Sequence, residues 1–131
     1  MDKDTRLKDA LQNIIGGDVV DDDTTLTSHS TDYSLLEVRP QVVVYPRDAT
    51  DLGALIKFVT ENHDNPDYTI AAPDDPNTKV SLSLTARAAG TCMSGGSLTH
   101  SIVVDFTRYM DKIGEVDHID DNNGLGTAQP G

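Results

Sequence analysis

Hydrophobic residues near the start of the chain recur with a helical period. Over residues 5–15 the apolar positions are spaced by three and four, which places them on one face of a helix: Leu7, Ala10, Leu11, Ile14 and Ile15. Asp4 or Thr5 can cap the start of this helix, and Gly16-Gly17 can end it. Residues 18–39 show no sustained period, so we expect an extended surface connection there.

A second helix is predicted directly after a short apolar run. The run "QVVVYP", residues 41–46, is β-branched and closed by Pro46, which is typical of a buried strand. Thr50 is a suitable N-cap, Asp51 favours the positive end of a helix, and apolar residues then repeat at helical spacing for about 12 residues. Together the two elements predict a βα unit.

The rest of the chain reads as strands and turns. Extended segments are predicted at Tyr68–Ala72 and Val80–Ala86, with the turn sequence "PDDPNTK" between them. "SIVVDF", residues 101–106, predicts another strand, and residues 113–119 a further one before the turn-rich tail "DDNNGLGTAQPG". The expected order is helix, strand, helix and then several strands, which indicates the α+β class.

Composition narrows the classes of function. The 131 residues suit one domain, and with no long apolar run and a polar start we expect a soluble cytoplasmic protein without a membrane span. A formal net charge of −12 disfavours nucleic-acid binding. The single cysteine excludes an internal disulfide, and the scattered histidines show no metal-ligand spacing, so no metal site is expected.

The stretch "ARAAGTCMSGGSL", residues 86–98, carries the candidate chemistry. Small side chains let backbone N–H groups converge on a phosphate or diphosphate, with hydroxyls from Thr91, Ser94 and Ser97 and one cation from Arg87. The stretch matches neither the P-loop nor the G-x-G-x-x-G motif, and an ordinary small-residue loop is the alternative. Cys92 can be read as a nucleophile beside His100 or simply as a small residue in the loop.

Several motifs in order resemble one family. "QVVVYPRDATDLGALIKFV", "LTARAAGTCMSGGSLTHSIVVDFTRYMDKI" and "TAQPG" are similar in order and spacing to the FAD-linked oxidases of the vanillyl-alcohol-oxidase type, and most of all to the branch of D-lactate and glycolate dehydrogenases. The resemblance implies the first, mixed α/β subdomain of a PCMH-type FAD-binding domain plus the start of the second subdomain. Residues 1–30 would be an N-terminal helix and connection, and residues 31–131 a partial FAD-binding domain with its pyrophosphate loop at 87–97.

The family pattern also implies roles for single residues. The strand end at Pro46 would lie near the adenine of FAD, and Asp105 in the last apolar strand would support the loop. The pyrophosphate loop would comprise Arg87, Ala88, Ala89, Gly90, Thr91, Cys92, Met93, Ser94, Gly95 and Gly96. Thr91 stands where branches with covalent flavin have histidine, so the resemblance implies non-covalent FAD. Asp32 and Tyr33 match a segment that covers the cofactor in the family, with surface packing as the alternative.

Ala88 and Ala89 depart from the family's usual glycines and would be strained at positive φ. The family's later flavin contacts and its substrate domain with the catalytic bases do not occur in this sequence, so no catalytic residue is expected here. We therefore expect the FAD-binding portion of an oxidoreductase acting on a 2-hydroxy acid such as D-lactate or glycolate. The alternatives are a non-catalytic FAD-binding module, and a flavoenzyme of the same fold with another substrate, such as the reductase of cell-wall precursor synthesis. Expected partners are FAD and either a complementing C-terminal segment or a second copy.

Overall fold

The computed structural model describes residues 3–131, with side chains from Arg6 onward. In chain order the first five elements are α1 (Lys3–Gln12), β1 (Asp18–Val20), α2 (Asp23–Ser28), β2 (Val42–Tyr45) and α3 (Ala49–Asn62). The remaining six are strands: β3 (Ile70–Ala72), β4 (Asp75–Val80), β5 (Leu84–Arg87), β6 (Ile102–Asp105), β7 (Ile113–His118) and β8 (Gly124–Ala128). The mixture of helices and several sheets confirms the α+β class.

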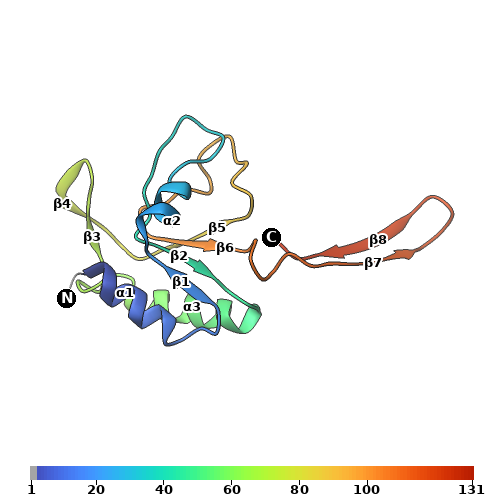
Figure 1. Ribbon diagram of the computed structural model, residues 1–131, viewed down its shortest axis with the longest axis horizontal. Coiled ribbons are helices and arrows are strands. Elements are labelled where there is room, and N and C mark those ends of the chain that lie inside the picture. Colours follow the sequence, from blue (N-terminus) through green and yellow to red (C-terminus); the bar gives the residue numbers. More distant parts are fainter. Residues whose placement is uncertain (1–2) are drawn as a thin grey trace.

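A four-stranded sheet with the order β1-β2-β6-β5 forms the centre of the molecule. β2, β6 and β5 run parallel, and β1 runs antiparallel to β2 at one edge. Figure 1 shows α1 and α3 on one side of this sheet, α2 on the other, and the β7–β8 hairpin projecting away from the body. Since the carboxyl ends of β2, β5 and β6 share one edge, the segments that follow these strands begin side by side.

Two apolar clusters cover the two faces of the sheet. Leu7, Leu11 and Ile15 from the first helical segment pack with Leu55 of α3 on the larger cluster, together with Val42, Val44, Ile102 and Val104 from the strands. Burial of each such aliphatic side chain contributes about 1.5–3 kcal/mol. On the opposite face the smaller cluster consists of Leu26, Val43, Tyr45 and Val103. Successive side chains of β2 point to opposite faces, and both faces are buried in an apolar cluster. Every position of the "VVVY" run is therefore apolar.

The segment 18–39 contains two regular elements and is not the extended connection that we expected. Val19 is buried opposite Val44 in the β1–β2 pair, and the Asp22 carboxylate caps α2 by accepting from the Thr25 backbone N–H at 3.0 Å. A three-residue strand and a six-residue helix are too short to produce a period. The sequence marks these two elements only by the capping Asp22 and by the valine pair of β1.

Helix boundaries differ from the expectation at both helices. α1 begins at Lys3, and the proposed caps Asp4 and Thr5 lie among residues whose side chains are not described. For α3 the N-cap is Asp48, whose Oδ1 accepts from the N–H groups of Thr50 and Asp51, so the prediction of Thr50 as cap is wrong. An aspartate two residues earlier satisfies the same free amides.

Buried Asp51 connects the end of the first helical segment to α3. Its carboxylate accepts from the backbone N–H groups of Gly16, Gly17 and Arg47 at 2.8–3.0 Å. A Cβ on Gly17 would overlap the carbonyl oxygen of Tyr45, so only glycine allows this close approach to β2. α1 already ends at Gln12, so the prediction that the glycine pair ends this helix is wrong. The pair instead admits the turn into β1.

Two more predictions need correction. The segment predicted as one strand at 80–86 is divided between β4 and β5, which belong to different sheets, and most of the expected turn "PDDPNTK" is β4 itself. The turn-rich tail contains β8, which pairs with β7. β8 is exposed throughout and β4 at all positions except Val80, so no alternation of buried and exposed positions marks either strand in the sequence.

Candidate functional site

The small-residue loop leaves the carboxyl end of β5 and returns to the start of β6. Arg87, the last residue of β5, is in register with Asp105, the last residue of β6, and the Phe106 N–H donates to the Arg87 carbonyl at 3.0 Å. Ligands of parallel sheets bind at this edge because the connecting segments diverge there. The loop is thus placed where a ligand site is expected.

Two glycines give the loop its shape. Gly90 and Gly95 have φ of 70° and 77°, the left-handed region that glycine adopts without penalty. A Cβ on Gly90 would overlap the Arg87 guanidinium, and one on Gly95 would lie 2.6 Å from Leu36 Cδ1. Among the described residues no non-glycine has positive φ, so Ala88 and Ala89 are unstrained and the departure from the family's glycines is tolerated.

The loop borders an open cavity of about 420 Å³ that its own residues line. The lining residues are Ala86, Arg87, Ala88, Ala89, Gly90, Thr91, Cys92, Gly96 and Ser97. Among the described residues, the backbone N–H groups of residues 89–93 and of Gly95 donate no hydrogen bond, whereas that of Ser94 donates to the Cys92 sulfur. Such free donors around a concavity are suited to an anion.

Arg87 supplies the positive charge of the cavity. Its Nη2 donates to the carbonyl of Thr31 at 2.9 Å, whereas its Nη1 is buried and has no hydrogen-bond partner among the described residues. An unpaired buried donor on a cation is costly unless an acceptor reaches it. Arg87 and the loop amides are thus the hydrogen-bond donors that this cavity offers to an anion.

The segment 31–34 lies against the loop. The Tyr33 N–H donates to the Cys92 carbonyl at 3.0 Å, and the Ser97 hydroxyl lies 3.4 Å from Asp32 Oδ2. The pKa of Asp32 lies below its ordinary value, because the carboxylate accepts hydrogen bonds from Ser34 and, more weakly, from Ser97. The Tyr33 ring itself is exposed, so its backbone and not its ring contacts the loop.

Cys92 and His100 do not form a catalytic pair. Hydrogen bonds from the Ser94 side chain and from the amides of Ser94 and Gly96 lower the pKa of the Cys92 thiol. His100 lines a separate, larger cavity with Glu37, Arg39 and Gln41, and within the described chain it shares no hydrogen bond with Cys92. The reading of Cys92 as a small loop residue is the one that this geometry favours.

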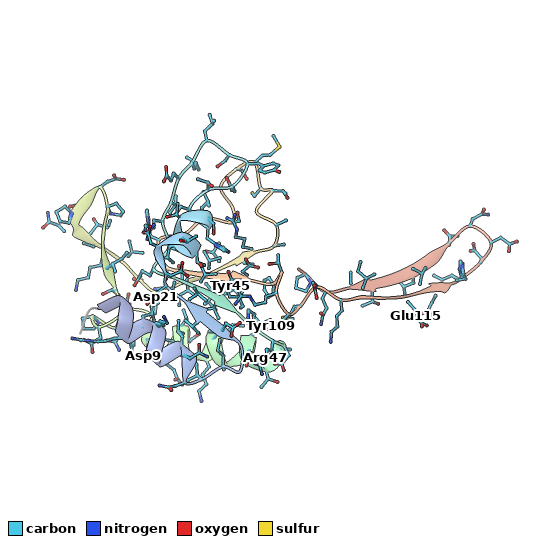
Figure 2. The ribbon with its side chains drawn as sticks, viewed as in Figure 1. Asp9, Asp21, Tyr45, Arg47, Tyr109 and Glu115 are labelled. Atoms are coloured by element: carbon cyan, nitrogen blue, oxygen red, sulfur yellow. The ribbon has the colours of Figure 1, made fainter. Side chains whose placement is uncertain are left out.

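Not every predicted site residue lines the cavity. Ser94 and Gly95 belong to the loop but do not line the cavity, and Pro46 is fully buried at the end of β2, across β6 from the loop. Beside Pro46 the guanidinium of Arg108 stacks on the Tyr45 ring, 3.6 Å from its centre. The Arg47 guanidinium lies 5.7 Å from the centre of the Tyr109 ring, and both residues are labelled in Figure 2. This carboxyl edge therefore carries cationic and aromatic side chains beside β2 and the cation of Arg87 at β5.

Sequence reasoning missed one buried pair beneath the loop. His29 Nε2 lies 2.8 Å from Asp105 Oδ2, and Asp105 Oδ1 accepts from the N–H and hydroxyl of Thr107. Burial raises the pKa of Asp105, but the hydrogen bonds from His29 and Thr107 outweigh it, so the pKa lies below its ordinary value. The two residues are 76 positions apart, and no local pattern could connect them.

Two absences concern the part of the chain that the structure describes. Within residues 6–131, whose side chains the structure describes, no three His, Cys, Asp or Glu side chains gather into a group suited to a metal ion. None of the helices within residues 3–131 has both the length and the apolar character that crossing a membrane requires.

Comparison with known proteins identifies relatives along most of the chain. No protein-family model matches it. The D-2-hydroxyglutarate dehydrogenase of Pseudomonas putida is 34% identical over 109 residues, 82% of this chain, and that of Escherichia coli is 27% identical over 110 residues, 84% of this chain. The protein of the same name from Pantoea ananatis is 30% identical over 68% of this chain.

These alignments cover only 9%, 9% and 7% of the three relatives' own lengths. The names specify a 2-hydroxy acid, as the resemblance implied, but that acid is 2-hydroxyglutarate and not D-lactate or glycolate. The chain belongs to the FAD-linked oxidase family and matches a small part of the length of these members.

Proposed function

We propose that this chain is the diphosphate-binding part of the FAD domain of a flavin-dependent dehydrogenase that oxidises a 2-hydroxy acid. The observation that carries the proposal is the loop cavity at the carboxyl edge of the sheet, which is lined by Arg87 and by loop residues whose backbone amides have no partner among the described residues. An acidic chain can bind an anion in this way because backbone dipoles supply most of the positive potential.

The residues divide by the part of the cofactor that they would contact. The amides of Ala89, Gly90 and Thr91, together with Arg87, would bind the diphosphate oxygens. The edge around Pro46, with its guanidinium–tyrosine stacks, would lie towards the adenosine. When bound, the flavin supplies the hydride-accepting group, and these residues hold and orient it. Because Thr91 replaces the histidine of covalent branches, the bound flavin should be released when the protein is precipitated with acid.

The 2-hydroxy acid is inferred from the names of the relatives. D-2-hydroxyglutarate is the first acid to test, followed by D-lactate and glycolate. Because the chain spans less than a tenth of those relatives, we expect residues 1–131 to bind FAD without turnover. Residues 31–131 are proposed as the partial FAD-binding domain, although β1 from the preceding residues adds to the same sheet.

A binding titration tests the proposal. Calorimetry of the purified chain with FAD, ADP and adenosine should show binding of FAD and ADP, and markedly weaker binding of adenosine, which lacks the diphosphate. Arg87→Met should weaken ADP binding by about tenfold, because a hydrogen bond to a charged group contributes roughly 1.5–3 kcal/mol. Arg39→Met is the matched control, since Arg39 pairs with Asp23 and Thr27 away from the loop. Equal affinity for ADP and adenosine would contradict the diphosphate assignment.

A further inference from the structure

The buried His29–Asp105 pair links two parts of the fold that meet at the loop. His29 is the C-cap of α2, and its Nδ1 lies 2.8 Å from the Thr25 carbonyl while Nε2 faces Asp105. A neutral imidazole can donate from one ring nitrogen and a protonated one from both. The ring also packs edge-on against Tyr45, with 6.2 Å between ring centres. His29 is thus held from three sides and has little freedom to move.

The residues directly after His29 are those that contact the loop. Thr31 accepts from Arg87 at the beginning of the loop, Tyr33 donates to Cys92 in its middle, and Asp32 lies by Ser97 near its end. Ser30 fixes the intervening turn, since its hydroxyl donates to the Leu26 carbonyl and its carbonyl accepts from Val38 N–H. One short segment therefore contacts the loop at three points along its length.

The other partner of His29 stands at the base of the same loop. Asp105 is in register with Arg87, and both end parallel strands. The hydrogen bond between His29 and Asp105 consequently ties the bracing segment, residues 29–33, to the strand edge from which the loop departs.

We propose that His29, through Asp105, is a positioning residue that holds the bracing segment so that Arg87 and the loop amides converge on one diphosphate. It touches no ligand itself. The ligand part of this inference rests on the proposed function, whereas the positioning of the loop is a property of the protein alone. Because the effect passes through a hydrogen bond and not through packing, a side chain with a donor at the Nε2 position should replace histidine.

Three variants of the chain test the inference. His29→Leu fills the space without a donor, and His29→Gln places an amide N–H₂ near the position of Nε2. Arg39→Met serves as control because Arg39 also hydrogen-bonds α2, through Thr27 and Asp23, but does not contact the loop residues that the bracing segment contacts. Urea unfolding of each variant gives the folded fraction, by which the binding data are corrected.

Two readouts separate positioning from mere stability. ADP affinity of the folded protein should fall about tenfold in His29→Leu, which is the scale of one hydrogen bond to a charged group, and should return in His29→Gln. Without ligand, hydrogen exchange at the Tyr33 amide should accelerate, and ¹⁵N relaxation at Gly90 and Gly95 should show greater motion, in His29→Leu alone. Arg39→Met should change neither.

Unchanged Tyr33 exchange in His29→Leu, no recovery in His29→Gln, or an equal effect of Arg39→Met would each overturn the inference. If the wild-type chain does not bind ADP, the proposed function fails, and the exchange and relaxation data still decide whether His29 positions the loop.

Discussion

Replacing Gly90 with alanine tests whether the loop must have its observed backbone conformation. Gly90 is buried with φ of 70°, a region that costs an L-residue about 1–2 kcal/mol. The added Cβ would overlap Arg87 Nη2 and lie 2.6 Å from Cζ. The guanidinium would therefore have to move away from the Thr31 carbonyl, at a further cost of about 1 kcal/mol for the lost hydrogen bond.

The total of roughly 2–3 kcal/mol can appear in either of two measurements. If the loop retains its shape, the free energy of unfolding in urea falls by that amount. If the loop rearranges, stability is retained and ADP affinity falls by about 30- to 150-fold, since every 1.4 kcal/mol is a factor of ten. Circular dichroism during urea titration and calorimetry with ADP together account for both cases.

The control is Gly53→Ala. Gly53 lies within α3 with no atom within 4 Å of an added Cβ, so alanine should stabilise the protein by about 0.5–1 kcal/mol and leave ADP binding unchanged. A Gly90→Ala protein that matches wild type in both unfolding free energy and ADP affinity would refute the reasoning that glycine is required there.

Three further predictions concern the fold and its surroundings. Asp48→Ala should lower the free energy of unfolding by about 1 kcal/mol in urea titration, because the α3 cap is lost, whereas Thr50→Ala should have little effect; the reverse order would show that Thr50 is the cap. Because the folded-state pKa of Asp105 is lowered, its contribution to stability is present at neutral pH and is lost as the pH falls from about 5 through that pKa. Between neutral and acidic pH, the free energy of unfolding should therefore fall less for Asp105→Asn than for wild type. Equal acid sensitivity would show that Asp105 does not contribute. The β7–β8 hairpin exposes Ile113, Val116, Ile119 and Leu125, and unpaired strand edges favour association. Light scattering should therefore show self-association that rises with protein concentration and is reduced in the double variant Val116→Lys, Leu125→Lys. A wild-type monomer at every concentration would contradict this.

Local sequence patterns were sufficient to predict the elements that are long or buried throughout. The stripe Leu7, Leu11 and Ile15 predicted the first helix, and the valine runs predicted β2 and β6, because burial of their faces is the main stabilising term. The loop was recognised from its composition, and Gly90 and Gly95 do adopt the positive φ that only glycine tolerates well. These features depend on residues within a few positions of each other.

Long-range contacts determined the strands and side-chain pairs that the sequence did not predict. β1 and β8 are strands because of the strands beside them, and the contacts of Arg87 with Thr31 and of His29 with Asp105 join residues 56 and 76 positions apart. A hydrogen bond between distant residues leaves no period in the sequence, since each partner needs only the right atom at the right place in space. The amino-acid sequence by itself thus determined the α+β class and the position of the loop, and only the tertiary structure decided which residues brace that loop, because the sheet brings the ends of β5 and β6 to the segment after α2.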